Sequence, residues 1–212
     1  NEIPKALVPL YGKSLVARQI EVLNSSGIKD IGIVTGYKSE KFNKMGLPLF
    51  YNKYFSTTNM VESLFCAIDF LEKSKEDILI SYGDIVYEKK NLDIIINTNA
   101  DIAVMVDEDW LNLWSIRNEN PLIDAETLKL DSSGYIIELG KKPTSIEDID
   151  GQYTGLIKLS STKINEIIDF YYSMDRNKTY DNRSFSQMYM TCFIQQLIDY
   201  KIYELFRKNI RS

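Results

Sequence analysis

The sequence predicts one α/β domain, with a mixed, mostly parallel sheet flanked by helices. Segments with helical periodicity alternate with short apolar segments of strand character, and this alternation is typical of α/β folds. The chain has 212 residues, 44% of them hydrophobic and 26% charged, which suffices for a full core in one domain. No repeat, low-complexity tract or linker divides it. Residues 1–212 are therefore expected to form a single domain.

The expected elements follow in order from local patterns. Helices are expected where apolar residues recur at helical spacing near capping residues, at 14–26, 60–73, 90–98, 162–174 and 185–200. Strands are expected where short apolar runs end at glycine, aspartate or a turn, at 29–37, within 77–87, at 101–107 and 152–159, with a hairpin over 128–137. Gly27 is the expected C-cap of the first helix, and Thr58 or Asn59 the N-cap of the second.

The strand within residues 77–87 carries the most informative pattern, because its apolar run leads directly into Gly83 and Asp84. Glycine permits close approach of backbone or ligand. A carboxylate at the carboxyl end of a strand lies where open α/β sheets bind ligands. Gly-Asp is also an ordinary turn pair. The residues alone therefore leave two interpretations open, a metal site and a simple turn.

Composition excludes several kinds of chemistry. The chain contains no histidine, so Ser-His-Asp triads, histidine-ligated zinc and an imidazole base are excluded. The net charge of -5 argues against a nucleic-acid partner. No apolar run is long enough to cross a bilayer, and the first residues lack a signal-peptide pattern. We expect a cytoplasmic protein whose two cysteines, Cys66 and Cys192, are buried thiols, and whose carboxylates and cations suit phosphoryl or nucleotidyl transfer.

An unusual segment combines acidic, aromatic and basic side chains. Trp110 and Trp114 lie four residues apart on one face of an expected helix, after Asp107 and before Arg117. Carboxylates and aromatic faces can hold an ammonium group, and an arginine can bind phosphate or carboxylate. A helix that packs two large rings into the core explains the same pattern equally well.

Several motifs together resemble the NTP-transferase family. Residues 4–10 (PKALVPL) and 12–15 (GKSL) resemble the second half of its signature, and Gly83-Asp84 stands where the family keeps a metal-binding aspartate. Residues 57–64 (TTNMVESL) and 151–156 (GQYTGL) resemble the branch that uses CTP to activate phosphocholine and phosphonates. The resemblance covers nearly the whole chain and implies a Rossmann-like domain of the GT-A type.

The resemblance also implies roles for individual residues. The expected catalytic residues are Lys5, which would contact the nucleotide triphosphate, and Lys142, which would face the acceptor's phosphate. Asp84 is expected to hold Mg²⁺. The alternatives are a solvated lysine for Lys5 and a basic surface turn for Lys141 and Lys142. The expected nucleotide-binding residues are Lys5, Tyr82 and Gly83, and the expected acceptor-binding residues are Asn59, Asp107, Trp110, Trp114, Arg117, Glu126 and Lys141. For Asn59 and Glu126, a helix cap or surface turn is the alternative role.

The implied activity is transfer of CMP from CTP to a small phosphate- or phosphonate-bearing acceptor, with release of pyrophosphate. The alternatives are a sugar-1-phosphate nucleotidyltransferase that uses UTP, dTTP or GTP, and a non-catalytic nucleotide-binding relative. The product would serve assembly of a capsule or other surface polysaccharide, a lipid or a phosphonate. A homodimer is left open.

The two ends of the sequence depart from the family pattern. The family's glycine-rich loop precedes the Pro4-Lys5 element, and a second metal aspartate follows later than Ser212; neither lies within the 212 residues. The first expected elements are a loop and a helix, so the sheet would lack a first strand. We therefore expect the sequence to be incomplete at both ends.

Overall fold

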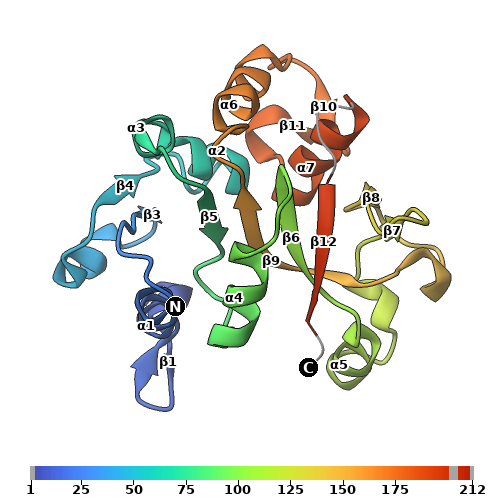
Figure 1. Cartoon of the computed structure of the whole chain (residues 1–212), viewed down its shortest axis with the longest axis horizontal. Coiled ribbons are helices and arrows are strands. Elements are labelled where there is room, and N and C mark those ends of the chain that lie inside the picture. The colour runs from blue at the N-terminus through green and yellow to red at the C-terminus, as the bar shows by residue number, and fades with distance from the viewer. Residues whose placement is uncertain (1–2, 201–204, 211–212) are drawn as a thin grey trace.

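The computed structural model describes residues 3–200 and the backbone of residues 205–210. At its centre lies a four-stranded sheet in the order β12–β6–β9–β5, with helices packed on both faces (Figure 1). Its strands are β5 (Ile78–Ser81), β6 (Ile102–Asp107), β9 (Gln152–Leu159) and β12 (Leu205–Ile210). The expected α/β class with a mixed sheet is confirmed.

The remaining elements of the described chain are short. The α-helices are α1 (Leu15–Ser25), α2 (Met60–Phe65), α3 (Ile68–Lys73), α4 (Lys89–Ile96), α5 (Trp110–Arg117), α6 (Ile164–Ser173) and α7 (Met190–Asp199). The 3-10 helices are η1 (Lys5–Leu7), η2 (Ser39–Met45), η3 (Pro121–Ile123), η4 (Ile146–Asp148) and η5 (Phe185–Gln187). The other strands are β1 (Pro9–Leu10), β2 (Lys13–Ser14), β3 (Ile33–Thr35), β4 (Leu49–Tyr51), β7 (Leu128–Leu130), β8 (Ile136–Leu139), β10 (Thr179–Tyr180) and β11 (Arg183–Ser184).

Strand β6 is buried on both faces, which makes it the centre of the core. Alternate side chains of a strand point to opposite faces. Ile102, Val104 and Val106 accordingly pack with residues of α2, α3, α6 and α7, whereas Ala103 and Met105 pack with residues of α1 and α4. The apolar run at 101–107 was predicted to form a strand, and its burial on both faces explains why that run does not alternate with polar residues.

Most strand pairs in the central sheet are antiparallel, so the expectation of a mostly parallel sheet is wrong. β12 is parallel to β6, but β9 is antiparallel to both β6 and β5. Strands β5, β6 and β12 therefore run in one direction, and β9 runs the opposite way between two of them. Hydrophobic patterns identify a strand without giving its direction, which depends on the connection that leads into it.

Two expected helices are divided in the structure. The helix expected at 60–73 is interrupted between α2 and α3, where the Ala67 N–H donates to the Leu64 carbonyl at 3.0 Å, a bond of the tighter 3-10 type. The expected N-cap Asn59 is confirmed, since its side chain accepts from the Met60 N–H at 2.9 Å. The helix expected at 185–200 begins as α7 only at Met190, because Met188 is extended and fully buried.

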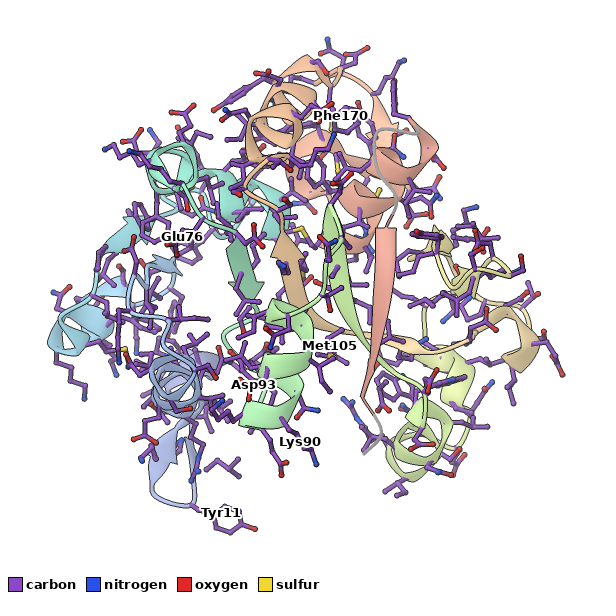
Figure 2. All side chains as sticks on the ribbon, in the orientation of Figure 1. Tyr11, Glu76, Lys90, Asp93, Met105 and Phe170 are labelled. Carbon is purple, nitrogen blue, oxygen red and sulfur yellow. The ribbon has the colours of Figure 1, made fainter. Side chains whose placement is uncertain are left out.

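A smaller parallel pair, β3–β4, lies beside the central sheet. Strands β3 and β5 line a shared cavity of about 1200 Å³, together with residues of α1, α2 and α3. The β1–β2 hairpin directly precedes α1 and projects from its N-terminal end. Tyr11, at the tip of the hairpin, points away from the protein body with 94% of its surface exposed (Figure 2). The expected hairpin at 128–137 is confirmed as β7–β8, with Gly134 at a positive φ of 86°.

Both cysteines are free thiols. Cys192 is buried as expected, but Cys66 is exposed, so the expectation of a buried thiol is wrong at that position. Cys66 follows the last turn of α2, where its side chain contacts the Glu62 carbonyl at the surface instead of the core.

Among the described residues, no helix combines the length and the apolar composition that a membrane crossing requires.

Candidate functional site

One end of the cavity brings together four residues that the sequence analysis singled out. Asn59, Tyr82, Gly83 and Asp84 all line it, from the start of α2 and from the segment that follows β5. Helix α1 and strands β3 and β5 supply an apolar wall behind them. Asp84 therefore follows the carboxyl end of β5 and lines the cavity; its role as a metal ligand stays a prediction.

Lys5 and Asp84 form an ion pair at this end of the cavity. The Lys5 side chain, on η1, is 79% exposed and the Asp84 side chain 30% exposed. Gly83 permits this approach of η1, because a Cβ at position 83 would lie only 3.2 Å from Cβ of Ala6. The two residues expected to handle the triphosphate and its metal ion are thus adjacent. Both polar groups remain accessible to a ligand.

Gln19 of α1, which the sequence analysis missed, holds the loop that carries Asp84. Its Nε2 donates to the carbonyls of Tyr82 (2.8 Å) and Ile85 (2.7 Å), and its Oε1 accepts from the Ser81 hydroxyl at 3.0 Å. Gln19 is only 5% exposed. A glutamine on the buried face of an amphipathic helix is an available sequence signal, because a buried amide needs polar partners.

The residues present fit one Mg²⁺ ion only if a ligand contributes further oxygen atoms. In the described part of the chain, no group of three or more histidine, cysteine, aspartate or glutamate side chains could hold a metal ion. Mg²⁺ is often bound by one or two carboxylates together with substrate phosphates. Asp84, half-buried beside the cavity, meets that requirement when a triphosphate supplies the other ligands.

Two phenol rings pack against each other beside the segment that carries Asp84. Tyr82 and Tyr153 stack edge to face, with ring centroids 5.8 Å apart. Gly155 makes room for this arrangement, because a Cβ there would lie 2.7 Å from the Tyr82 ring. Burial raises the pKa of both phenols, and the Glu126 charge raises the pKa of each further. The Asp84 charge also raises the pKa of Tyr82.

Glu126 is partly buried, and Gln152 of β9 holds its backbone. Its backbone N–H donates to Gln152 Oε1 at 3.2 Å, and Gln152 Nε2 donates to its carbonyl at 2.6 Å. Burial raises the pKa of the Glu126 carboxyl above its ordinary value, and Asp181 adds to this effect, whereas Thr191 and Arg183 oppose it. A desolvated carboxylate with a raised pKa is a candidate functional group, and the predicted contact of Glu126 with the acceptor stays a prediction.

Two further residues whose charges act on the pKa of Glu126, Asp181 and Arg183, were not singled out from the sequence. They belong to the β10–β11 hairpin, in which Asp181 and Asn182 adopt positive φ angles of 48° and 60°. An Asp-Asn pair is typical of such a two-residue turn. The available sequence signal was therefore a turn, and only the folded chain shows that the charges of this hairpin act on Glu126.

The segment with two tryptophans forms α5, as expected, and its rings pack against the loop that precedes Glu126. Trp110 is 3% exposed and contacts Ala125 and Ile149. Trp114 Nε1 donates to the Asp124 carbonyl at 3.3 Å, and the Arg117 guanidinium lies 5.3 Å from the Trp114 ring centroid. These contacts agree with the packing alternative for Trp110. A role in binding stays a prediction for Trp114 and Arg117.

Asp107 ends β6 opposite Gln152, the residue that holds the Glu126 backbone. Burial raises the pKa of the Asp107 carboxyl, and its Oδ1 accepts from the Asp109 N–H at 3.0 Å. The carboxylate therefore already holds the turn that leads from β6 into α5. Its predicted contact with the acceptor stays a prediction.

Lys141 and Lys142 are exposed, and the ammonium group of each contacts nearby groups of the protein. Lys141 Nζ lies 2.7 Å from Glu138 Oε2. Lys142 Nζ donates to the carbonyls of Leu122 (2.7 Å) and Ile123 (2.5 Å) at η3. These partners belong to the loop and hairpin around Glu126. Reaching the acceptor's phosphate would require Lys142 to exchange the η3 carbonyls for that phosphate, and its catalytic role stays a prediction.

Comparison with known proteins identifies the family of this site. Residues 1–129 match the model of the MobA-like NTP transferase domain, and these residues include Lys5, Asn59, Asp84 and Glu126. The chain belongs to this family. The resemblance inferred from the sequence motifs is therefore confirmed, and so is the expectation of a nucleotidyltransferase.

Several characterised proteins are similar to this chain. It is 44% identical over 204 residues to the CTP:phosphoglutamine cytidylyltransferase of Campylobacter jejuni, covering 92% of this chain and 80% of that protein. It is 37% identical over 83 residues to the choline-phosphate cytidylyltransferase of Streptococcus pneumoniae, covering 37% and 33%. A bifunctional sugar-1-phosphate nucleotidylyltransferase/acetyltransferase of Sulfurisphaera tokodaii is 29% identical over 163 residues, covering 74% and 36%.

Solved structures share the fold at low sequence identity. The inositol-1-phosphate CTP transferase of T. maritima has a TM-score of 0.69 and 14% identity, over 99% of this chain and 78% of that one. A putative glucose-1-phosphate thymidylyltransferase of Bacillus anthracis, in complex with a sucrose, has the same TM-score and identity over 97% and 78%. These likenesses support the predicted nucleotidyltransferase fold.

Proposed function

We propose that the protein is a cytidylyltransferase, which transfers CMP from CTP to a small phosphorylated acceptor and releases pyrophosphate. The observation that carries this proposal is the ion pair of Lys5 with Asp84, which lines the cavity, in a chain 44% identical to a relative named as a CTP:phosphoglutamine cytidylyltransferase. A cation and a metal-binding carboxylate at one point suit the triphosphate.

In the proposed reaction, a phosphate oxygen of the acceptor attacks the α-phosphorus of CTP. The bond from the α-phosphorus to the bridging oxygen breaks, and pyrophosphate leaves with that oxygen. The acceptor needs no strong base, because a phosphate monoester already carries about 1.5 to 2 negative charges at neutral pH. Lys5 neutralises charge on the triphosphate, and its exposed side chain is long enough to move from Asp84 to a bound phosphate. Mg²⁺ on Asp84 would supply further charge neutralisation when bound.

The proposed acceptor carries an amino group as well as its phosphate. The C. jejuni relative is named for phosphoglutamine and the S. pneumoniae relative for choline phosphate, and both compounds contain a cationic nitrogen. We assign the partly buried Glu126 carboxylate, whose pKa burial raises, as the group that binds this cation. We further propose that the reaction takes place in the cytoplasm and that its product serves surface polysaccharide assembly. We also propose that residues 1–212 act as a single domain.

A screen of pyrophosphate release tests this function. Purified protein is incubated with Mg²⁺, one of CTP, UTP, dTTP or GTP, and one of phosphoglutamine, phosphocholine, 2-aminoethylphosphonate or glucose 1-phosphate. Release with CTP and an amine-bearing acceptor is the expected result. Release with UTP or dTTP and glucose 1-phosphate would instead identify a sugar-1-phosphate nucleotidyltransferase.

Asp84→Asn provides the matched control, because it keeps the size of the side chain and removes the charge. We expect the rate to fall by about 10²- to 10³-fold, as when a preorganised charge-stabilising group is lost. Calorimetry of CTP binding in the presence of Mg²⁺ addresses the non-catalytic alternative. Binding of CTP without turnover of any acceptor would leave only a nucleotide-binding role.

A further inference from the structure

Asn52 is a buried asparagine whose side chain holds one loop together from the inside. It directly follows β4 and is only 3% exposed. Its Nδ2 donates to the hydroxyls of Thr58 and Ser63, each at 2.9 Å, and its Oδ1 accepts from the Tyr54 N–H at 2.9 Å. Both donor hydrogens and the acceptor oxygen of the amide therefore have partners.

The two hydroxyls that Asn52 contacts are themselves bonded to the backbone. Thr58 Oγ1 donates to the Tyr54 carbonyl at 2.9 Å, and Ser63 Oγ donates to the Asn59 carbonyl at 3.1 Å. Because a hydroxyl has a single hydrogen, each of the two can only accept from Asn52. The direction of every bond in this network is thus fixed, and only a side chain with two donor hydrogens satisfies both hydroxyls.

The residues that Asn52 holds belong to the wall of the cavity. Thr58, Asn59 and Ser63 line the same cavity as Asp84. Asn52 itself is buried behind this wall and is not among the lining residues. It can therefore act on a ligand in the cavity only through the residues that it holds, which makes it a candidate positioning residue.

A second side chain holds the same segment from the outside. The exposed Gln187 of η5 donates from Nε2 to the Thr57 carbonyl at 2.9 Å. The Asn59 N–H donates to the Ser186 carbonyl at 2.9 Å, and Asn59 Nδ2 donates to the Gln187 carbonyl at 3.4 Å. The start of α2 is thus held between Asn52 on one side and η5 on the other.

We propose that Asn52 and Gln187 are positioning residues, which hold residues 57–59 in the conformation in which Thr58 and Asn59 contact CTP. A wall held in its binding conformation lowers the cost of ordering on binding. This inference rests on the proposed function for the identity of the ligand. It assigns Asn59 to the nucleotide instead of the acceptor, because Asn59 shares the cavity with Asp84.

Hydrogen exchange tests the positioning step without a ligand. In Asn52→Asp, the carboxylate still accepts from the Tyr54 N–H but cannot donate to the two hydroxyls. The Thr58 and Asn59 amides should therefore exchange about 10-fold faster than in wild type, the effect of one or two lost hydrogen bonds. Gln187→Ala changes an exposed side chain and should accelerate exchange at Asn59 without unfolding the protein. Unchanged exchange at these amides in both variants would overturn the inference.

Calorimetry of CTP binding in the presence of Mg²⁺ tests the consequence for the ligand. Asn52→Asp should weaken CTP binding about 10-fold, and Gln187→Ala about 3-fold, because it removes a single bond at the surface. The affinity for the phosphorylated acceptor, measured with phosphoglutamine, should not change in either variant. A loss confined to the acceptor would overturn the assignment of this segment to the nucleotide.

Gln195→Leu is the matched control, because it removes another buried amide. Gln195 accepts from the Leu139 N–H at 2.6 Å and donates to Asp199 at 2.7 Å, and it is not among the described residues that line the cavity. The variant should lower the melting temperature and leave CTP affinity unchanged. An equal loss of CTP affinity in Gln195→Leu and Asn52→Asp would reduce the effect to general destabilisation and overturn the inference.

Failure of the proposed function has a different signature. Wild-type protein would then bind no CTP and release no pyrophosphate, while the Thr58 and Asn59 amides would still exchange faster in Asn52→Asp. Conversely, CTP binding by Asn52→Asp and Gln187→Ala at the wild-type affinity would overturn the inference and leave the proposed function intact.

Discussion

The position of Asp84 depends on two uncharged neighbours, Gln19 and Gly83. Gln19 ties both sides of its loop to α1 through the carbonyls of Tyr82 and Ile85, and Gly83 lets η1 carry Lys5 into contact with it. A metal-binding carboxylate must be held in one position for its charge to be useful at the reacting phosphorus. At the scale of single residues, the site therefore consists of the reacting groups and the buried amide that positions them.

Substitution of Gln19 tests this positioning role. Gln19→Leu preserves the approximate size of the side chain but leaves two carbonyls and the Ser81 hydroxyl without their partner. We expect a loss of about 2 to 4 kcal/mol in the free energy of unfolding. Mg²⁺-dependent CTP binding should weaken as well, because Asp84 is no longer held. Urea denaturation and calorimetry measure the two effects. Glu21→Ala on the exposed face of α1 is the control, and CTP binding by Gln19→Leu at the wild-type affinity would contradict the role.

At the scale of elements, α5 and η4 act as supports for the loop around Glu126. Helix α5 presents Trp110 to Ala125 and Ile149. The 3-10 helix η4 places Asp148 where it accepts from the Thr144 and Ser145 N–H groups and pairs with Lys129 of β7. Neither support contributes an established ligand to the site, yet each limits where the loop can lie.

Substitution of Trp110 distinguishes a packing role from a binding role. Trp110→Ala should lower the free energy of unfolding by about 3 to 5 kcal/mol, the usual cost of removing a buried aromatic ring. Trp110→Phe should retain most of the stability and leave acceptor affinity unchanged, because the ring is buried and faces the protein interior. Denaturation curves and acceptor titrations of both variants provide the comparison. A loss of acceptor affinity in Trp110→Phe at wild-type stability would favour the binding role.

The Asp148 carboxylate makes the support at η4 pH-dependent. Lys129 and the N–H groups of Thr144 and Ser145 hold the pKa of Asp148 well below its ordinary value. A lowered pKa in the folded state stabilises the fold above the unfolded-state pKa of about 3.9. This contribution is lost as the pH falls further, toward the folded-state pKa.

Asp148→Asn should therefore be less stable than wild type at pH 7, and the difference should shrink below a pH of about 4. Melting temperatures recorded across this range measure it. A difference that is independent of pH would show that the carboxylate acts only through its shape. Glu147→Gln, on the same 3-10 helix, supplies a comparison at a neighbouring exposed carboxylate.

At the scale of the whole molecule, the central sheet places the elements of the site. β6 is buried on both faces and β9 runs antiparallel between β6 and β5. This order brings the ends of β5 and β6 and the start of β9 to one side, with Asp84, Asp107 and Gln152 respectively. Helices α1 and α4 pack together on the face of the sheet that carries Ala103 and Met105. There, Asp93 of α4 (Figure 2) accepts from the Ser26 hydroxyl at 3.0 Å.

Ligand binding should stabilise this assembly as a unit. With Mg²⁺ present, CTP at about one hundred times its Kd should add about 2.7 kcal/mol to the free energy of unfolding, which corresponds to a rise of about 5 to 11 °C in melting temperature for a domain of this size. UTP and GTP at the same concentration should give smaller shifts. Asp84→Asn should abolish the shift with CTP. Equal shifts for all nucleotides would contradict selection of CTP.

The sequence alone determined the fold class, most of the helices and strands, the family, and the Lys5, Gly83 and Asp84 elements. These features depend on local patterns: apolar periodicity, caps, and a glycine followed by a carboxylate at a strand end. The tertiary structure alone decided the antiparallel direction of β9, the break between α2 and α3, and the neighbours of Glu126. Gln19, Asp181 and Arg183 lie far from Glu126 or Asp84 along the chain. Their proximity results from sheet order and packing, which no local pattern encodes.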